Sequence, residues 1–224
     1  MGDTEGNETT VRNEAWDLRR AAGVFLGHAS PRVIVVALGA TAVARLVVAR
    51  WSWWDLLAPG AILAAQPFTE WLIHVFLLHF KPRRVAGMKV DPLVARKHRA
   101  HHLDPKDQLL VFIPLPALAG LILGSALIWL VTSSAPIALS AMTAIYLILL
   151  VYEWTHFLIH STYRPRHALY RYVWRAHRNH HYRNERYWFG VTVHLADHLL
   201  GTFPNRADVE VSPTARTLGV GQAA

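Results

Sequence analysis

Four apolar runs constrain the fold of this chain more than any other feature. They cover residues 33–48, 57–80, 109–131 and 137–151, and the last continues into a helical face with Glu153, His156 and His160. Each run is close to the roughly 20 residues that a helix needs to cross a bilayer. Helices of this kind satisfy all their backbone hydrogen bonds internally, as lipid requires. We therefore predict an all-α integral membrane protein with four transmembrane helices in two hairpins.

The flanks and interruptions of the runs fit this interpretation. Arg45 interrupts the first run and is expected to snorkel to an interface. Pro114 and Pro116 are expected to kink or break the start of the third helix, because proline lacks the backbone N–H that a helix uses. An aromatic belt, typical of a membrane surface, follows the first run and is formed by Trp51, Trp53 and Trp54.

Lysine and arginine are unevenly distributed among the connections between the runs. Segment 81–107 and the chain after His160 are rich in them, whereas 51–56 and 133–136 contain none. Connections on the cytoplasmic side carry the excess of basic residues in membrane proteins. We therefore predict that both termini and a histidine-rich helical cap lie in the cytoplasm. The net charge of +8 is interpreted as topology and contact with anionic lipid rather than nucleic-acid binding.

The chain divides into three parts by composition. Residues 1–29 are polar and acid-rich and are predicted to form a cytoplasmic segment with a short amphipathic helix at about 14–26. No basic stretch precedes an early apolar core there, so a cleaved signal peptide is not expected. Residues 30–203 are predicted to form one membrane domain, and residues 204–224 an exposed C-terminal tail.

Histidine is the second unusual feature, with 14 residues, of which twelve fall in pairs or triples. The chain has no cysteine, which excludes thiolate metal sites and Fe–S clusters. Four of the clusters hold ten imidazoles, more than one metal ion accepts, and two metals with four or five nitrogens each account for them. The predicted ligands are His74, His79, His98, His101, His102, His156, His160, His177, His180 and His181.

The spacing within the clusters predicts how helices would present them. His156 and His160 are one turn apart, and each His-x2-His-His triple places its first histidine within about 60° of the other two, so all three share one face of a helix. His74 and His79 are five residues apart, which is about 140° around an α-helix. That spacing suits a helix that frays or ligation of two different metals.

Several acids and two further histidines lie close to the clusters. Metal-bound imidazoles usually donate their other N–H to a carboxylate or a carbonyl, so nearby acids are candidates for that role or for direct ligation. His28 and His167 stand apart and are expected to be ordinary surface or core residues. The candidates near the clusters are Glu70, Asp104, Glu153, His194, Asp197 and His198.

The ligand set also bears on the metal. Imidazole-rich sites without thiolates suit Fe, Zn, Cu or Ni, and the sequence does not choose among these. A hydrolytic zinc needs only three protein ligands, so ten histidines favour redox chemistry on oxygen by two irons. Zinc is expected to replace iron during overexpression, because zinc binds such sites more tightly.

The order of the clusters resembles that of the fatty acid hydroxylase/sterol desaturase superfamily of membrane oxygenases. That order is His-x4-His, His-x2-His-His, His-x3-His and His-x2-His-His. The segment 189–202, in which Gly-Val-Thr leads to Asp197 and then to Gly201-Thr202, is similar to the family's ending. The resemblance covers about 64–203. It implies a dinuclear metal centre held by the ten histidines, O2 as oxidant and a lipid substrate.

From this resemblance we expect a membrane-bound di-iron oxygenase that hydroxylates a fatty acyl chain or a sterol-like substrate. Members that act on sphingolipid acyl chains often carry a fused cytochrome b5 domain, which these 224 residues do not contain. Electrons are therefore expected from a separate cytochrome b5-like or ferredoxin-like protein and its reductase.

Other functions remain open at this point. The same centre could desaturate a lipid, or the chain could be a carotenoid hydroxylase of the same superfamily. The third histidine pair has a three-residue gap, whereas carotenoid hydroxylases usually have four, which favours the acyl or sterol branch. A membrane zinc hydrolase is the alternative from a second class, although no His-Glu-x-x-His motif is present. A bis-histidine haem carrier or metal transporter is the non-enzymatic alternative.

Overall fold

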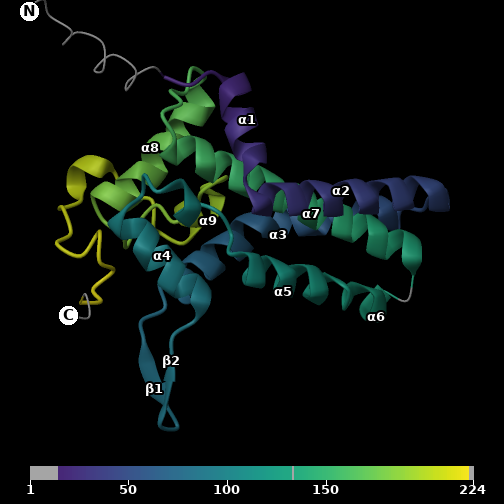
Figure 1. The fold of residues 1–224 in the computed structure, drawn as a ribbon, viewed down its shortest axis with the longest axis horizontal. Coiled ribbons are helices and arrows are strands. Elements are labelled where there is room, and N and C mark those ends of the chain that lie inside the picture. The colour runs from purple at the N-terminus through teal and green to yellow at the C-terminus, as the bar shows by residue number, and fades with distance from the viewer. Residues whose placement is uncertain (1–14, 133, 222–224) are drawn as a thin grey trace, which may run out of the picture.

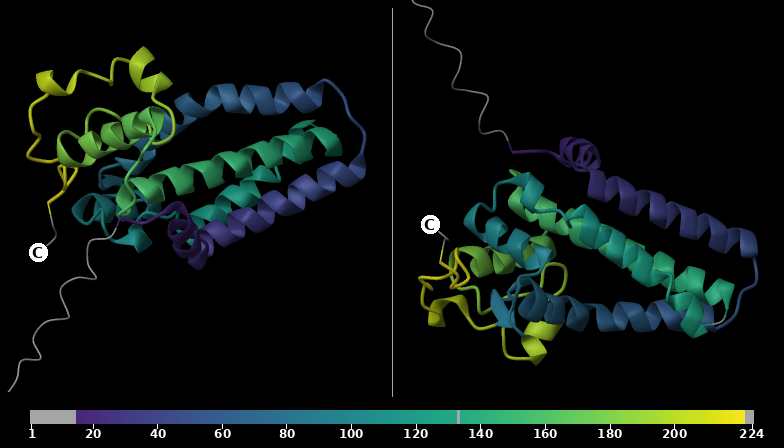
Figure 2. Two further views of the ribbon diagram at one scale, coloured as in Figure 1. Left: turned by 90° about the horizontal axis from the view of Figure 1, so that it is seen from above. Right: turned by 60° about the horizontal axis from the view of Figure 1, so that its bottom comes forward.

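The computed structural model describes residues 15–132 and 134–221 and is mostly helical (Figure 1). Four segments are long and apolar enough to cross a membrane, as predicted: Ala29–Val48, Trp54–Leu78, Gln108–Thr132 and Ala135–His160. They form an elongated bundle, and the other elements gather as a cap at one end of it (Figures 1 and 2). The predicted all-α class with four candidate spans is confirmed.

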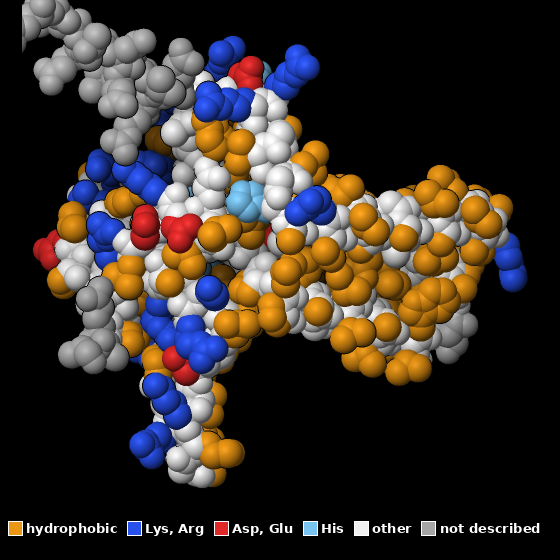
Figure 3. Space-filling view, viewed as in Figure 1, with side chains coloured by type: hydrophobic (Ala, Val, Ile, Leu, Met, Phe, Trp, Pro, Cys, Tyr) orange, Lys and Arg blue, Asp and Glu red, His pale blue; other side chains and the backbone are white. Residues whose placement is uncertain are grey.

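The first hairpin of the bundle consists of α2 (Ala29–Val48) and α3 (Trp54–Leu72), which continues into a π-helix, η1 (Ile73–Leu78). Val36 and Val47 of α2 are exposed by 70% and 77% although both are apolar. Hydrophobic side chains cover the visible face of the bundle in Figure 3. Such a surface is unfavourable in water and matches the hydrocarbon of a bilayer.

The second hairpin consists of the short helices α5 (Leu115–Ser125) and α6 (Ile128–Thr132) and the long helix α7 (Ala135–His160). The predicted break occurs at Pro114, which directly precedes α5. Pro136 lies in the first turn of α7, where its missing N–H costs nothing. Helix α7 packs along α2, α3 and α6, so it forms the centre of the bundle and reaches into the cap.

The end of the bundle away from the cap holds a buried ion pair that differs from the expectation for Arg45. Instead of snorkelling, Arg45 is buried, with Nη2 2.8 Å from Asp55 Oδ1 and Nε 2.8 Å from Ser140 Oγ. Its guanidinium also lies over the Trp51 ring, 3.6 Å from the centroid. A guanidinium in an apolar surrounding requires such a partner, and the pair ties α2, α3 and α7 together.

The cap contains α1 (Leu18–Gly27), α4 (Leu93–Leu103), α8 (Ala168–Tyr182) and α9 (Leu195–Leu199). It also contains two 3₁₀ turns (Gln108–Leu110 and Arg206–Asp208) and an antiparallel hairpin of β1 (Arg83–Val85) and β2 (Met88–Val90). Helix α1 begins after Asp17, whose side chain accepts from Arg20 N at 2.7 Å, and it buries Phe25 against Phe112 and Phe157. This aromatic core joins the cap to the end of α7.

The C-terminal segment differs from the predicted exposed tail. Val209, Ala215 and Leu218 are buried, and Arg183 Nε donates to Val209 O at 2.7 Å. Ser212 N also donates to Arg183 O at 2.7 Å, so the segment is held against the C-terminal end of α8. The predicted N-terminal amphipathic helix is present as α1, and the rest of that polar segment, residues 1–14, lies outside the described residues, as do 222–224.

Candidate metal centre

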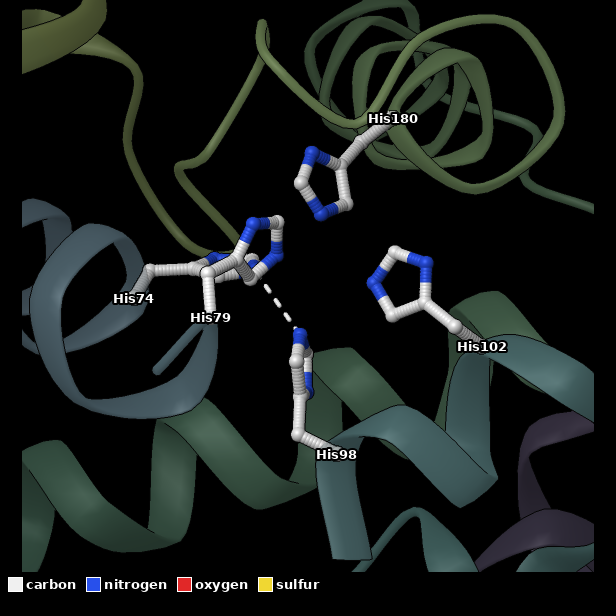
Figure 4. A group of neighbouring side chains, drawn as sticks. All are labelled: His74, His79, His98, His102 and His180. Carbon is white, nitrogen blue, oxygen red and sulfur yellow. Dashed lines mark hydrogen bonds between the residues drawn. The ribbon is translucent and has the colours of Figure 1, made fainter. Parts of the chain in front are cut away.

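The ten clustered histidines converge in two adjacent groups of five. The first, here the His74 group, draws its rings from η1 and the residue that follows it, from α4 and from α8, and Figure 4 shows them pointing toward a common centre. The second, the His101 group, draws on α4, α7 and α8. In each group one nitrogen per ring lies within 4.8 Å of all the others. The His74 group is His74, His79, His98, His102 and His180; the His101 group is His101, His156, His160, His177 and His181.

Each histidine triple is divided between the two groups. The triples were predicted to present three nitrogens on one face of a helix. On α4, His98 and His102 are one turn apart and join the His74 group, whereas His101 joins the other. On α8 the division is reversed, since His180 joins the His74 group and its two neighbours join the His101 group. The two helices therefore link the groups, and the His102 and His181 rings stack across them at 4.1 Å.

The π-helix explains the spacing of the first pair. His79 N donates to His74 O at 3.1 Å, a bond that spans five residues instead of four. The wider turn brings residues five apart onto one side, so both imidazoles reach the same group. Ligation of two different metals by this pair, one of the predicted alternatives, is therefore wrong for this geometry. Single π turns of this type are rare and occur mostly at functional sites.

Backbone carbonyls, rather than side-chain acids, orient the rings. The Nδ1 atoms of His102, His156 and His180 lie 2.8, 2.9 and 2.8 Å from Ala215 O, Val111 O and Tyr187 O. His74 Nδ1 lies 2.5 Å from Phe189 O. Donation from Nδ1 leaves the Nε2 lone pair of each ring for a metal. Three of these carbonyls belong to segments after α8, which the sequence did not identify as part of the site.

Two buried acids hold the segment that orients His74. Four consecutive backbone N–H groups, of residues 189–192, donate to carboxylates. Asp197 accepts the first two, at 3.0 and 2.7 Å, and Glu70 accepts the other two. Gly190 fits between them only because it lacks a side chain, since a Cβ there would lie 2.6 Å from Val193 O. Glu70 and Asp197 thus act on His74 through the Phe189 carbonyl.

Glu153 likewise binds a backbone N–H group close to a carbonyl that contacts a histidine, here in the His101 group. Its Oε1 accepts from Ser30 Oγ at 2.5 Å and from Ile113 N at 2.9 Å. Ile113 belongs to the short segment whose Val111 carbonyl faces His156. Glu153 therefore joins the start of α2 and the segment before α5 to α7. It positions the carbonyl that His156 contacts through the backbone of residues 111–113.

The other candidates lie outside both groups. Asp104 is exposed and accepts from Lys106 N at 3.2 Å. His194 Nδ1 lies 3.0 Å from Asp197 Oδ2, and His198 Nε2 lies 2.6 Å from the Tyr172 hydroxyl oxygen. These two histidines support the Asp197 loop and the surface of α8. His28 stacks on Phe112 at 4.3 Å, and His167 directly precedes α8 without a side-chain cap bond.

Burial sets the charge state of the cap residues. It lowers the pKa of His79, His98 and His181 well below the ordinary value, and neighbouring imidazoles lower it further. Burial also lowers the pKa of His102 to about 3, although its bond to Ala215 O opposes this. These rings are neutral at physiological pH, the form that ligates a metal. For Asp197, burial raises the pKa, but hydrogen bonds from His194, Thr202, Gly190 and Phe189 outweigh it and keep the carboxyl ionised.

The spacing of the ring nitrogens fits metal ions. Nitrogens that share an ion at about 2.1 Å lie roughly 3.0–3.4 Å apart. His74 and His98 approach to 3.1 Å through their Nε2 atoms, and His160 lies 3.1 Å from His177 and 3.2 Å from His101 in the same way. Among the described residues, buried Nε2 atoms of His79, His102 and His180 have no hydrogen-bond partner. A metal ion in the His74 group, to which all three belong, would satisfy them.

Comparisons with known proteins identify a family and relatives of this chain. The sequence profile of the fatty acid hydroxylase family matches residues 60–202. The chain is 30% identical over 138 residues to the dihydroceramide fatty acyl 2-hydroxylase FAH2 of Arabidopsis thaliana, and 29% identical over 137 residues to FAH1 of the same plant. These matches cover 60% and 61% of this chain and 55% and 56% of those proteins, so the chain spans about half of their length.

A solved structure has a similar fold. It is that of full-length scs7p, in which only the hydroxylase domain is visible, with a TM-score of 0.63 and 19% identity. The match covers 86% of this chain and 68% of that one. At this identity the likeness concerns the arrangement of the helices, and it includes most of the bundle and cap.

Proposed function

This chain belongs to the fatty acid hydroxylase family, and we propose that it is a membrane-bound di-iron oxygenase that hydroxylates a fatty acyl chain of a lipid, with O2 and electrons from a separate donor protein. The observation that carries the proposal is the convergence of ten histidines into two groups of five at the end of an apolar bundle. The relatives named as dihydroceramide fatty acyl 2-hydroxylases support a ceramide-type acyl chain as the first substrate to try.

The residues of the chain have three roles in this proposal. The His74 group and the His101 group would each hold one iron, and the pair would supply the activation of O2. The carbonyls of Val111, Tyr187 and Phe189 orient the rings so that their lone pairs converge. The Phe189 ring lies 5.4 to 5.6 Å from the rings of His74, His79 and His180 and shields that side of the group from water.

The experiment that tests the activity uses isotopically labelled O2. The purified chain in lipid nanodiscs receives a dihydroceramide, a reductant and 18O2, and the product is analysed by mass spectrometry. Label in a new hydroxyl group is expected. An unlabelled product with a new double bond would mean desaturation instead, and a Soret band in the purified protein would indicate haem and contradict the proposal.

Matched variants make this test specific to the site. His156→Ala and His160→Ala should each abolish the product and reduce the bound metal, because no other donor on α7 replaces them. His167→Ala should retain activity, since His167 lies outside both groups. Full activity of His156→Ala would contradict the assignment of the centre.

We also propose that the cap and both termini face the cytoplasm, on the basis of the lysine and arginine distribution. The chain has no cysteine, so single cysteines report topology directly. A cysteine at Ser134, between the last two spans, should react with a membrane-impermeant maleimide from outside intact cells. A cysteine at Lys106 should react only after lysis, and labelling of Lys106→Cys from outside would reverse the orientation.

A further inference from the structure

The β1–β2 hairpin projects from the side of the cap and its surface is almost entirely exposed (Figure 1). The two strands pair Arg83 with Val90, Arg84 with Lys89 and Val85 with Met88. The turn between them, Ala86-Gly87, has positive φ at both positions (49° and 80°), as in the tight two-residue turns that match strand twist. The hairpin is therefore short and of defined shape, but all three residues of β1 and two of the three in β2 are exposed.

The pairing makes the hairpin amphipathic. Directly paired residues share a face, and successive residues alternate between faces. Val85, Met88 and Val90 therefore lie on one face, and Arg84 and Lys89 lie on the other. Val85 and Met88 are 48% and 69% exposed. Arg83 shares the apolar face at its base, where its guanidinium lies 4.5 Å from the centroid of the Phe80 ring.

One arginine fixes the direction of the hairpin. Arg99 of α4 donates to Phe80 O at 2.8 Å, just before β1, and to both carboxylate oxygens of Asp91 at 2.7 and 2.8 Å, just after β2. Both ends of the hairpin are thus held by a single guanidinium. Helix α4 also carries three histidines of the centre, so the same helix positions both the hairpin and these histidines.

The apolar face of the hairpin is directed toward the membrane side of the molecule. In the sequence, the hairpin lies between the end of the second candidate span and the start of α4. Figure 3 shows hydrophobic side chains along the side of the hairpin toward which the bundle extends, and Lys and Arg along the opposite side. A bilayer around the bundle would therefore end next to the apolar face.

We propose that residues 83–90 form a hairpin that lies in the membrane interface, with Val85 and Met88 in the headgroup–acyl boundary and Arg84 and Lys89 against anionic headgroups. An isolated two-stranded hairpin is marginally stable in water, and a lipid surface removes its exposed Met and Val from water. Basic side chains next to the bilayer are attracted to anionic lipid. A second copy of this chain fits this surface less well than a bilayer does, because two copies would bring the same basic residues together and these repel each other.

This inference does not depend on the proposed activity and is tested without it. Single cysteines at Met88, Lys89 and, as an exposed reference on the cap, Val211 are spin-labelled in nanodiscs of phosphatidylcholine with phosphatidylserine. The label at Met88 should be relaxed more by O2, which concentrates in lipid, than by a water-soluble nickel chelate. The labels at Lys89 and Val211 should show the reverse. A Met88 label as accessible to nickel as the Val211 label would overturn the proposal.

A charge reversal tests the role of the headgroups. Lys89→Glu in the Met88→Cys background should move the label toward water when phosphatidylserine is present, and Arg186→Glu, the same kind of change at another exposed site, should not. Equal depth of the Met88 label with and without phosphatidylserine would overturn the electrostatic part of the proposal. Protection of the label from both O2 and nickel would mean a protein contact and would overturn it entirely.

Discussion

The acids near the histidines bind backbone N–H groups, and this changes what their substitution should do. Glu70 and Asp197 hold the segment 189–192, and Glu153 holds Ile113. Each acid binds a backbone segment whose carbonyl contacts an imidazole. The acid therefore positions the ring through that segment and not by direct contact. Groups of this kind are worth on the order of 10–100-fold in metal affinity or activity.

Glu153→Gln should be mild, because the amide oxygen can still accept from Ser30 and Ile113. Glu153→Ala should lower metal affinity and activity by on the order of 10–100-fold, since the Val111 carbonyl loses its support. Metal titration by calorimetry and the labelled-oxygen assay measure both variants. An equal loss of metal affinity and activity in Glu153→Gln and Glu153→Ala would mean that the charge itself is required and would contradict a positioning role.

Gly190→Ala should damage the His74 group selectively. Its Cβ would lie 2.6 Å from Val193 O and 2.8 Å from His194 Nδ1, so the segment must shift and displace the Phe189 carbonyl. Elemental analysis should show a fall toward one metal ion per chain, because the His101 group does not use this segment. Gly120→Ala is the control, since nothing lies within 4 Å of its Cβ position. Unchanged metal content in Gly190→Ala would contradict the role of segment 189–192 in orienting His74.

At the scale of elements, helix geometry decides which of the two groups each histidine joins. Helices α4 and α8 each give a pair one turn apart to one group and a single histidine to the other. Helix α7 gives only its pair, and η1 gives a pair five residues apart that a π turn brings together. The centre thus joins four helices, and each group draws its histidines from three of them.

The π-helix makes a prediction about chain length. Deleting Phe76, an exposed residue of η1, should leave His74 and the following histidine four apart on an ordinary α-helix, and metal binding should persist. Inserting one alanine after Phe76 should rotate His79 by about 100° and remove it from the group. Metal content per chain separates the two variants. Loss of metal in the deletion variant and retention of metal in the insertion variant would contradict the proposed role of the π turn.

At the scale of the whole molecule, the cap and the bundle are held by different forces. Apolar side chains suited to lipid cover the visible face of the bundle (Figure 3). The cap has ten buried or nearly buried imidazoles at its centre. A buried polar atom without a partner costs about 1–3 kcal/mol. We therefore expect the cap to depend on metal ions in a way that the bundle does not.

Removing the metals with a chelator should loosen the cap and leave the spans in place. Hydrogen exchange measured by mass spectrometry should show faster exchange in α4 and α8, and unchanged exchange in the apolar part of α7 at 138–150. Restoring the metal should reverse the effect, and His167→Ala should behave as the unmodified chain. Identical exchange with and without chelator would show that the histidines need no ion for stability.

The sequence by itself determined the spans, the helical class and the identity of the histidine clusters. Apolar runs of membrane length require helices, and ten imidazoles at helical spacing have few other uses, so local pattern was sufficient. The sequence also placed Pro114 correctly at a helix boundary. It was wrong about Arg45, because its partners Asp55 and Ser140 are brought together only by helix packing.

Only the tertiary structure decided how the clusters are shared. The division of each triple depends on how α4 and α8 face each other, and the π turn at His74 has no signature in the spacing alone. The carbonyls of Phe189, Tyr187 and Ala215 carry no side-chain signal in the sequence. Two of them contact histidines that are 115 and 113 residues away, so the sequence did not indicate these contacts. Local sequence specifies helices and donors, but contacts between distant segments determine which donors meet.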